Sequence, residues 1–261
     1  MTDVQDTGSP PGVPTVSVLR RWAERSLYAL ETRVARHPTL AQPLARLRGE
    51  GVLVERGTDL LIESFPRSAS SFAVAAFEMA QEAKRDLRVA HHVHTPAHVM
   101  VAVRLGVPAL VLIREPEDIV VSHVIRRPSR TVQAVLQGYL RFYEPLLPYR
   151  EGFVVGTFGE VVNDFGTVIR RINARFGTTF GEFENTEENV ERCLKEIDAE
   201  WRRRRGSSTL EWIVPRPSEA REALKPEIRE RYRSEASRLL RQRAERVFNT
   251  FSSGTTLRPS E

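Results

Sequence analysis

The chain has 261 residues, 41% of them hydrophobic and 28% charged, which is typical of a folded domain and argues against wholesale disorder. Its net charge of +5 favours an anionic partner but does not choose between a nucleotide, a sulfated sugar, a nucleic acid and a membrane surface. The longest apolar run, residues 105–113, is well short of the roughly 20 residues that cross a bilayer, and the single Cys193 excludes an intrachain disulfide.

The chain length suits one α/β domain, which we place at residues 16–251 between flexible tails at 1–15 and 252–261. The first sixteen residues have no basic segment followed by an apolar core, so they do not predict a secretory signal. Together with the single cysteine, this favours a cytoplasmic protein. Nearly all basic residues are arginine, a bias typical of a GC-rich, bacterial genome. The oligomeric state stays open, with a homodimer as one alternative.

Strand and helix patterns alternate along the chain, after an amphipathic helix predicted over residues 16–36. This alternation predicts a central parallel sheet in a three-layer α/β/α fold. The predicted strands are 59–65, 88–94, 108–114 and 152–158. The predicted helices that follow or separate them are 70–85, 96–105 with Thr95 as N-cap, 116–127 and 130–147. Ligands of such sheets bind beyond the carboxyl ends of the strands.

Three further segments follow the last predicted strand. Residues 161–176 predict a helix that Gly177 ends. Residues 185–205 are highly charged, and residues 218–251 predict one long amphipathic helix with a break near Pro226.

The first candidate site segment is Phe65-Pro66-Arg67-Ser68-Ala69-Ser70-Ser71-Phe72, between a predicted buried strand and a helix. A helix that starts after a strand presents free backbone N–H groups and its positive end to an anion, so this segment predicts a phosphate cradle. It is not a Walker A loop, because G-x-x-x-x-G-K-[ST] is absent. The alternative is a polar helix cap without a ligand.

The second candidate segment runs from Arg114 at the end of the strand 108–114 to Ser122 in the following helix. A guanidinium offers two parallel donors to a phosphate, and a hydroxyl adds a third. The alternative is an ordinary helix serine and an Arg114 side chain that pairs with Glu117 or Asp118.

The third candidate segment contains His91, His92 and His94 in the predicted strand 88–94. Strand alternation places His92 and His94 on one face and His91 on the other. An imidazole titrates near neutral pH and suits removal of a hydroxyl proton. The alternatives are packed histidines without chemistry and a metal site formed by His94 and His98, which no cluster of carboxylates or cysteines supports.

Taken in order, these segments resemble the motifs of sulfotransferases that use 3′-phosphoadenosine 5′-phosphosulfate (PAPS). That family's first motif is close to PKSGTTW or RSGSSF, its second is R-x-P-x-D-x-x-x-S, and its histidine segment is K-T-H-x-P. The resemblance covers about residues 58–180 and implies a P-loop-NTPase-like sulfotransferase architecture. It places His94 on the catalytic base and His92 where lysine is usual.

The same resemblance assigns roles at the nucleotide site. It implies that Arg67 contacts the phosphosulfate bridge and that Arg114 and Ser122 bind the 3′-phosphate. The loop residues implied at the 5′-phosphate are Ser68, Ala69, Ser70, Ser71 and Phe72. The implied reaction transfers the sulfuryl group to a hydroxyl of a small molecule or carbohydrate, releases adenosine 3′,5′-bisphosphate, and needs no metal and no nucleic acid.

The sequence departs from the family in three places. Arg67 replaces a frequent lysine, and Ala69 stands where glycine is typical, so a positive φ there would strain the loop. The family's late G-x-x-G-x-W-K element is absent, and Arg216 and Arg221 are candidates to replace its contacts. The acceptor pocket is open, with the segment 185–213 and the helix around Tyr139 and Tyr143 as candidate walls.

Two other functions stay open. A P-loop-like kinase or nucleotide-binding protein would use ATP, although the Walker lysine is missing. A basic nucleic-acid or membrane-surface binding protein would use residues 201–205 and the arginine-rich C-terminal helix.

Overall fold

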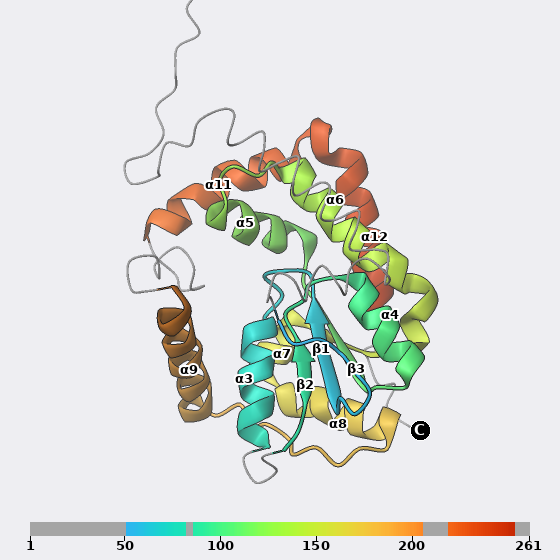
Figure 1. Ribbon diagram of the computed structural model, residues 1–261. Helices are drawn as coiled ribbons and strands as arrows, with labels where there is room; N and C mark the ends of the chain where they lie inside the picture. Colours follow the sequence, from blue (N-terminus) through green and yellow to red (C-terminus); the bar gives the residue numbers. More distant parts are fainter. Residues whose placement is uncertain (1–50, 82–85, 206–218, 254–261) are drawn as a thin grey trace, which may run out of the picture.

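A four-stranded parallel sheet lies at the centre of the chain, with strand order β2-β1-β3-β4 (Figure 1). The computed structural model describes residues 51–81, 86–205 and 219–253. Its strands are β1 (Leu60–Ser64), β2 (Val89–His91), β3 (Ala109–Ile113) and β4 (Val154–Thr157). Ser64 pairs with Leu112, and Ile113 pairs with Thr157, so β1, β3 and β4 end at the same edge.

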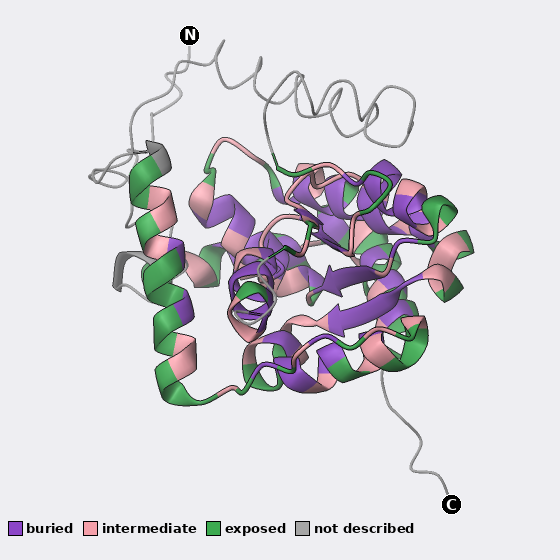
Figure 2. Ribbon diagram, turned by 60° about the horizontal axis from the view of Figure 1, so that its bottom comes forward, coloured by how far each residue is buried: buried purple, intermediate pink, exposed green. Residues whose placement is uncertain are grey.

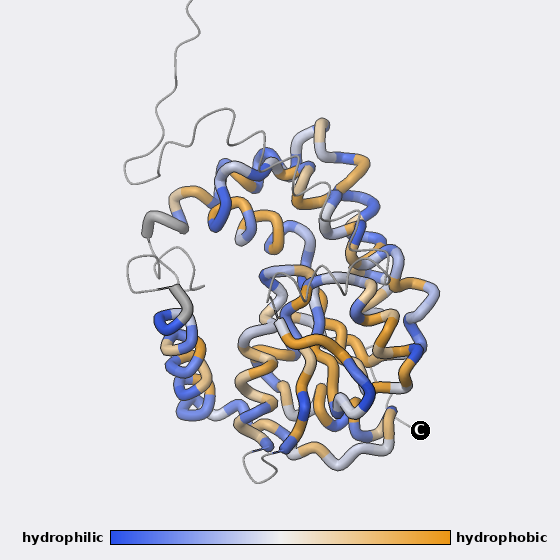
Figure 3. The backbone as a smooth tube through the Cα atoms, viewed as in Figure 1, coloured by the Kyte–Doolittle hydropathy of each residue, from blue (hydrophilic) through white to orange (hydrophobic). Residues whose placement is uncertain are grey.

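The sheet separates two apolar cores, because neighbouring residues of a buried strand point to opposite faces. Leu61 joins one core, whereas Leu60 and Ile62 join the other, and all three are fully buried. Burial of each such side chain contributes about 1.5–3 kcal/mol. Figure 2 shows the buried strands between helical layers, and Figure 3 shows strongly hydrophobic residues along the central strands. The predicted three-layer α/β/α fold with a parallel sheet is confirmed.

The helices divide between the two cores. Those on the Leu61 side are α4 (Pro96–Leu105), α5 (Pro116–Arg126), α6 (Val132–Tyr143), α11 (Glu219–Arg233) and α12 (Arg238–Ser252). Those on the other side are α3 (Ser70–Ala80), α7 (Phe158–Asn163), α8 (Phe165–Phe176) and α9 (Glu187–Arg205). No helix in the described residues is long and apolar enough to cross a membrane.

Two predicted helix ends are confirmed. Thr95 caps α4 by accepting a hydrogen bond from the backbone N–H of His98. Gly177 ends α8 in the left-handed conformation that glycine adopts without strain.

Three helix predictions were wrong in detail. The predicted helix 161–176 is two helices, since Asp164 starts α8 by accepting from the amide of Thr167. The predicted helix 130–147 ends at Tyr143 and continues as the 3₁₀ helix η1 (Glu144–Gly152), which contains prolines that cannot donate. The C-terminal helix continues through Pro226 and breaks at the 3₁₀ turn η3 (Glu235–Ser237).

The helix predicted at 16–36, the N-terminal tail and most of the C-terminal tail lie outside the described residues, as does Arg216.

Candidate active site

The turn between β1 and α3 has the backbone shape of an anion site. Arg67 and Ala69 adopt left-handed φ angles of 81° and 68°. Ala69 is the N-cap of α3 and makes no side-chain cap hydrogen bond. Within the described residues, no acceptor faces the backbone N–H groups of Ser70, Ser71 and Phe72. Alternating backbone of this kind forms a concave nest of N–H donors, so the helix start is open to an anion rather than closed by a polar cap.

Ala69 is the position at which a positive φ was predicted to strain the loop, and its φ is positive. A Cβ atom in this conformation costs roughly 1 kcal/mol relative to glycine. The loop therefore keeps its shape at a cost, which the surrounding packing offsets.

The three serines of this loop differ in their surroundings. Ser68 is fully buried, and its hydroxyl donates to the carbonyl of Phe65 at 2.9 Å. Ser70 is also buried, whereas the hydroxyl of Ser71 faces Nε2 of His92 at 3.3 Å. Phe72 packs edge-on against Phe183 with ring centroids 6.0 Å apart, so only its backbone N–H faces the turn.

The two predicted phosphate segments meet in one cluster. Nε of Arg67 donates to the hydroxyl of Ser122 at 2.9 Å. Nη1 of Arg114 donates to the carbonyl of Arg67 at 3.3 Å. Because β1 and β3 are neighbours and end at the same edge, residues far apart in sequence converge here.

Arg114 is held on several sides. Its guanidinium lies 3.9 Å from the centroid of the Phe158 ring and forms an ion pair with Asp118 at 3.5 Å. Glu117, the other carboxylate considered, instead pairs with Arg229 and Arg233 of α11. The Arg114 side chain thus keeps a strand-end position beside the loop, with its charge only partly neutralised by a half-exposed carboxylate.

Two tyrosines of α6 lock the ends of β1 and β3. The hydroxyl of Tyr143 donates to the carbonyl of Leu112 at 2.7 Å and accepts from the amide of Phe65 at 3.3 Å. The hydroxyl of Tyr139 donates to the carbonyl of Arg114 at 3.2 Å. Burial raises the pKa of both tyrosines well above the ordinary value. Both side chains are fully buried, so neither tyrosine itself faces an acceptor, and the helix around them stays a candidate wall of the acceptor pocket.

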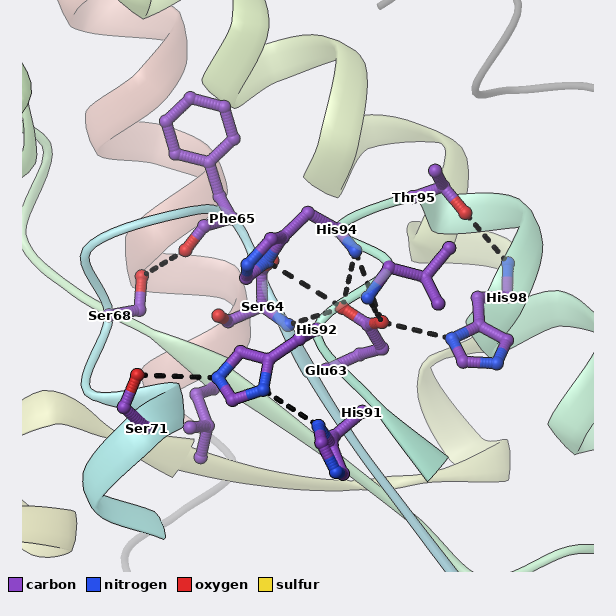
Figure 4. A network of polar contacts seen from close by, with 12 residues as sticks. Glu63, Ser64, Phe65, Ser68, Ser71, His91, His92, His94, Thr95 and His98 are labelled. Carbon is purple, nitrogen blue, oxygen red and sulfur yellow. Dashed lines mark hydrogen bonds and ion pairs between the residues drawn. The ribbon is translucent and has the colours of Figure 1, made fainter. Parts of the chain in front are cut away.

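The predicted strand 88–94 ends early. β2 stops at His91, and His92 and His94 adopt left-handed φ angles of 61° and 55°. The predicted strand alternation of the histidines is therefore wrong, because the chain turns after His91. The turn points His92 towards the loop and His94 towards the end of β1 (Figure 4).

His91 and His92 form a pair with their Nδ1 atoms 2.7 Å apart. At this distance one Nδ1 donates and the other accepts, so the pair carries at most one positive charge. Nε2 of His92 faces Ser71 on the opposite side, which brings this pair to the start of α3.

His94 is fixed in one tautomer by its backbone neighbours. Nδ1 lies 2.8 Å from the carbonyl of Ser64, and since a carbonyl only accepts, Nδ1 carries the proton. The neutral ring then has its lone pair on Nε2. The side chain of His94 is 28% exposed, so solvent can reach the ring that carries this lone pair. A histidine in this state can accept a proton at Nε2.

The sequence analysis missed Glu63, whose carboxylate lies between the backbone of His94 and the ring of His98 (Figure 4). Its fully buried carboxylate accepts from the amides of Val93 and His94 and from Nδ1 of His98. Burial raises the pKa of this carboxyl, but the hydrogen bond from His98 and the neighbouring His94 outweigh it, so the pKa lies below its ordinary value. The available signal was a carboxylate inside the otherwise apolar run 59–65.

The geometry does not favour a metal at His94 and His98. Nδ1 of His98 donates to Glu63 at 2.9 Å, and Nε2 accepts from the amide of Val54 at 2.7 Å. Both ring nitrogens are therefore already used within the protein, which leaves no lone pair for a ligand bond.

The basic C-terminal surface is extensively paired with carboxylates. The ion pairs along it are Lys225–Glu222, Arg231–Glu227, Arg238–Glu235, Arg241–Glu245 and Arg243–Glu144. Trp201 is half-buried, with the Arg126 guanidinium 5.2 Å from its ring centroid. These contacts are those of packed helices with solvated charges, and they do not single out a polynucleotide surface.

No family model matches the chain, and no curated protein matches it. Among solved structures, the chain is similar to the crystal structure of mouse sulfotransferase SULT7A1 complexed with PAP. The match has 16% identity, covers 74% of this chain and 90% of the other, and has a TM-score of 0.37. A likeness at this level assigns no family, so function has to be inferred from the chain's own residues.

Proposed function

We propose that the chain is a PAPS-dependent sulfotransferase that acts on a hydroxyl acceptor. The observation that carries this proposal is the contact between the two phosphate segments, in which Arg67 donates to Ser122 and Arg114 donates to the carbonyl of Arg67. A nucleotide with anionic groups at both ends is the kind of ligand that uses both segments together.

The donors present suit the two ends of PAPS. The uncapped start of α3 has free N–H groups and no acidic residue in its first turn, which suits the 5′-phosphosulfate. The Arg114 fork and the Ser122 hydroxyl suit the 3′-phosphate. The missing Walker lysine favours PAPS over ATP.

PAPS would supply the sulfuryl group. The acceptor oxygen forms a bond to sulfur while the bond from sulfur to the bridging oxygen breaks, and adenosine 3′,5′-bisphosphate (PAP) leaves. Nε2 of His94 takes the acceptor's hydroxyl proton, and Arg67 offsets the negative charge on the departing oxygen. The proposed acceptor is a small molecule or a carbohydrate that carries a hydroxyl group. No described residue has been assigned to select between these two classes.

Calorimetry with PAP tests the nucleotide site directly. We expect PAP to bind the full chain, and Arg114→Ala to weaken binding about 10- to 100-fold, because a charge-assisted hydrogen bond is lost. Arg170→Ala, which removes an exposed pair with Glu182, is the matched control and should leave binding unchanged. Absence of PAP binding, or tighter binding of ATP than of PAP, would contradict the proposal.

A labelled-sulfate screen of hydroxyl acceptors tests the chemistry. His94→Ala should abolish transfer from PAPS and keep PAP affinity within about threefold, because the ring contributes its base and not the nucleotide contacts. Equal loss of transfer and of PAP affinity would remove His94 from the role of base.

A further inference from the structure

A charged side chain occupies the interior of β1. Glu63 is fully buried in a strand whose other residues are apolar or small. An ionised carboxylate without partners would be very costly at such a position, so its neighbours must compensate for lost water. Glu63 therefore calls for a functional explanation rather than a packing one.

Every contact of this carboxylate comes from a donor. Oε1 accepts from the amide of Val93 at 2.8 Å and from Nδ1 of His98 at 2.9 Å. Oε2 accepts from the amide of Ser64 at 3.1 Å, and the amide of His94 lies 3.1 Å from both oxygens. A carboxamide or a protonated carboxyl would turn a donor of its own towards these N–H groups, so the site selects the ionised form.

The carboxylate controls both the backbone and the charge environment of His94. Its bond to the His94 amide holds a residue with a left-handed φ of 55°, which a side chain with a Cβ atom rarely adopts. The ring nitrogen Nδ1 lies 3.9 Å from Oε2 while it donates to the carbonyl of Ser64. The negative charge thus sits behind the protonated nitrogen and leaves Nε2 on the other side of the ring.

We propose that Glu63 is the positioning residue of His94. By accepting from the amides of Val93 and His94, it holds the turn that brings Nδ1 of His94 to the carbonyl of Ser64, so that Nε2 is the proton acceptor. Its negative charge stabilises the imidazolium that forms when the acceptor's proton arrives. The proton moves from the acceptor oxygen to Nε2, Nδ1 keeps its own proton, and Glu63 stays ionised throughout. This inference rests on the proposed function only in naming the source of the proton.

His98 anchors Glu63 in turn. Its Nε2 accepts from the amide of Val54, which fixes the tautomer and directs Nδ1–H at the carboxylate. Among the described residues, two other titratable side chains near this network are His92, whose ring centroid is 5.7 Å from that of His94, and Tyr143 of α6. Neither of these two adds a second negative charge at neutral pH, so the effect on His94 is assigned to Glu63.

The test is NMR of ¹⁵N-labelled histidine side chains in the full chain, with His94→Asn to assign the His94 signals. In the wild type we expect the neutral ring to be in the Nδ1–H form. Glu63→Gln should mix the two tautomers, because the turn that brings Nδ1 of His94 to the carbonyl of Ser64 loses the carboxylate that holds it. Glu78→Gln removes a carboxylate from α3 outside this network and is the matched control, with no change in the tautomer signals of His94.

Two measurements separate the possible failures. Calorimetry with PAP tests the proposed function. Glu63→Gln should keep PAP affinity within about threefold, because Glu63 contacts none of the residues that are predicted to bind the nucleotide. If PAP does not bind the wild type, the sulfotransferase proposal fails while the His94 signals still test Glu63. If PAP binds but Glu63→Gln leaves the tautomer of His94 unchanged, the inference about Glu63 is overturned.

A further measurement, made on the wild type alone, tests the inference if the Glu63→Gln variant fails to fold. The ¹³C shift of the Glu63 carboxyl in the wild type should report the ionised form at pH 6. A protonated Glu63 at that pH would also overturn the inference.

Discussion

The turns after β1 and β2 share a backbone shape and differ in what they bind. Each has two left-handed residues separated by one residue, Arg67 with Ala69 and His92 with His94. These four are the non-glycine residues with positive φ in the described part of the chain. In the second turn the backbone N–H groups bind the carboxylate of Glu63, whereas the first turn is followed by N–H groups with no acceptor from the described chain.

The difference teaches what the first turn requires. In the second turn, backbone of this shape binds a carboxylate of the same chain. The first turn has the same concave donors, the positive end of α3 and two nearby guanidiniums, but no resident anion. We propose that an anion from outside the chain completes it, in the role given above to the 5′-phosphosulfate.

The largest expected effect comes from giving the first turn an anion of its own. Ser71→Asp places a carboxylate in the first turn of α3, where it repels a phosphate and competes for the same N–H groups. We expect PAP affinity to fall at least about 100-fold, equivalent to about 2.7 kcal/mol, in calorimetry. The same change should stabilise α3 slightly, by about 0.5 kcal/mol, in thermal unfolding.

Asn189→Asp adds the same charge to the start of α9 and serves as the control. It should leave PAP affinity unchanged. If Ser71→Asp bound PAP as tightly as the wild type, the first turn would not be an anion site and the contrast with the second turn would lose its meaning.

Sequence patterns predicted the first turn better than the second. The apolar patterns at 59–65 and 108–114 predicted two strands of one parallel sheet, so Arg67 and Arg114 were expected at the same edge. That these two strands are neighbours is shown by the structure alone. The contact of Arg67 with Ser122 follows from that topology and from the helical position of Ser122. A positive φ at Ala69 was predicted as a source of strain, because the motif that this loop resembles has glycine at that position.

The second turn depends on tertiary contacts that no local pattern reveals. Alternating residues at 88–94 favour a strand, but hydrogen bonds that two backbone amides donate to Glu63 stabilise a turn at this point. The partner of that carboxylate, His98, lies 35 residues away and belongs to a helix. A single glutamate inside an apolar strand was the available warning, and its meaning appears only when β1 and α4 are packed together.

The next largest expected effect is on the pH dependence of stability, through one buried titratable side chain near each turn, His123 and Glu63. His123 stacks on Phe65 below the first turn, and burial, followed by the nearby Arg130, lowers its pKa well below the ordinary 6.5. Unfolding lets this histidine bind a proton that the folded state excludes. Stability should therefore fall as pH drops below about 6.5, by up to about 1.4 kcal/mol per pH unit, down to the lowered pKa.

The second turn should respond in a separate and more acidic range. The lowered pKa of Glu63 means that its stabilising contribution is present above about pH 4.5 and is lost as pH falls through the folded pKa. Chemical unfolding across pH measures both effects. His123→Gln, which still offers an acceptor to Arg130, should flatten the slope between about pH 6.5 and 5, while Glu182→Gln on the surface should not. An unchanged slope in His123→Gln would assign the acid sensitivity elsewhere.

The smallest expected effect tests the shared backbone shape itself. Ala69→Gly removes the Cβ atom from a left-handed position, so we expect the free energy of unfolding to rise by about 0.5–1 kcal/mol. Ala80→Gly, at the other end of the same helix, should lower it by about as much, because glycine there loses backbone entropy without relieving strain. The opposite signs are the signature of the left-handed turn. If both variants were destabilised equally, Ala69 would not adopt this conformation in solution, and the first turn would lose the feature it shares with the turn that holds Glu63.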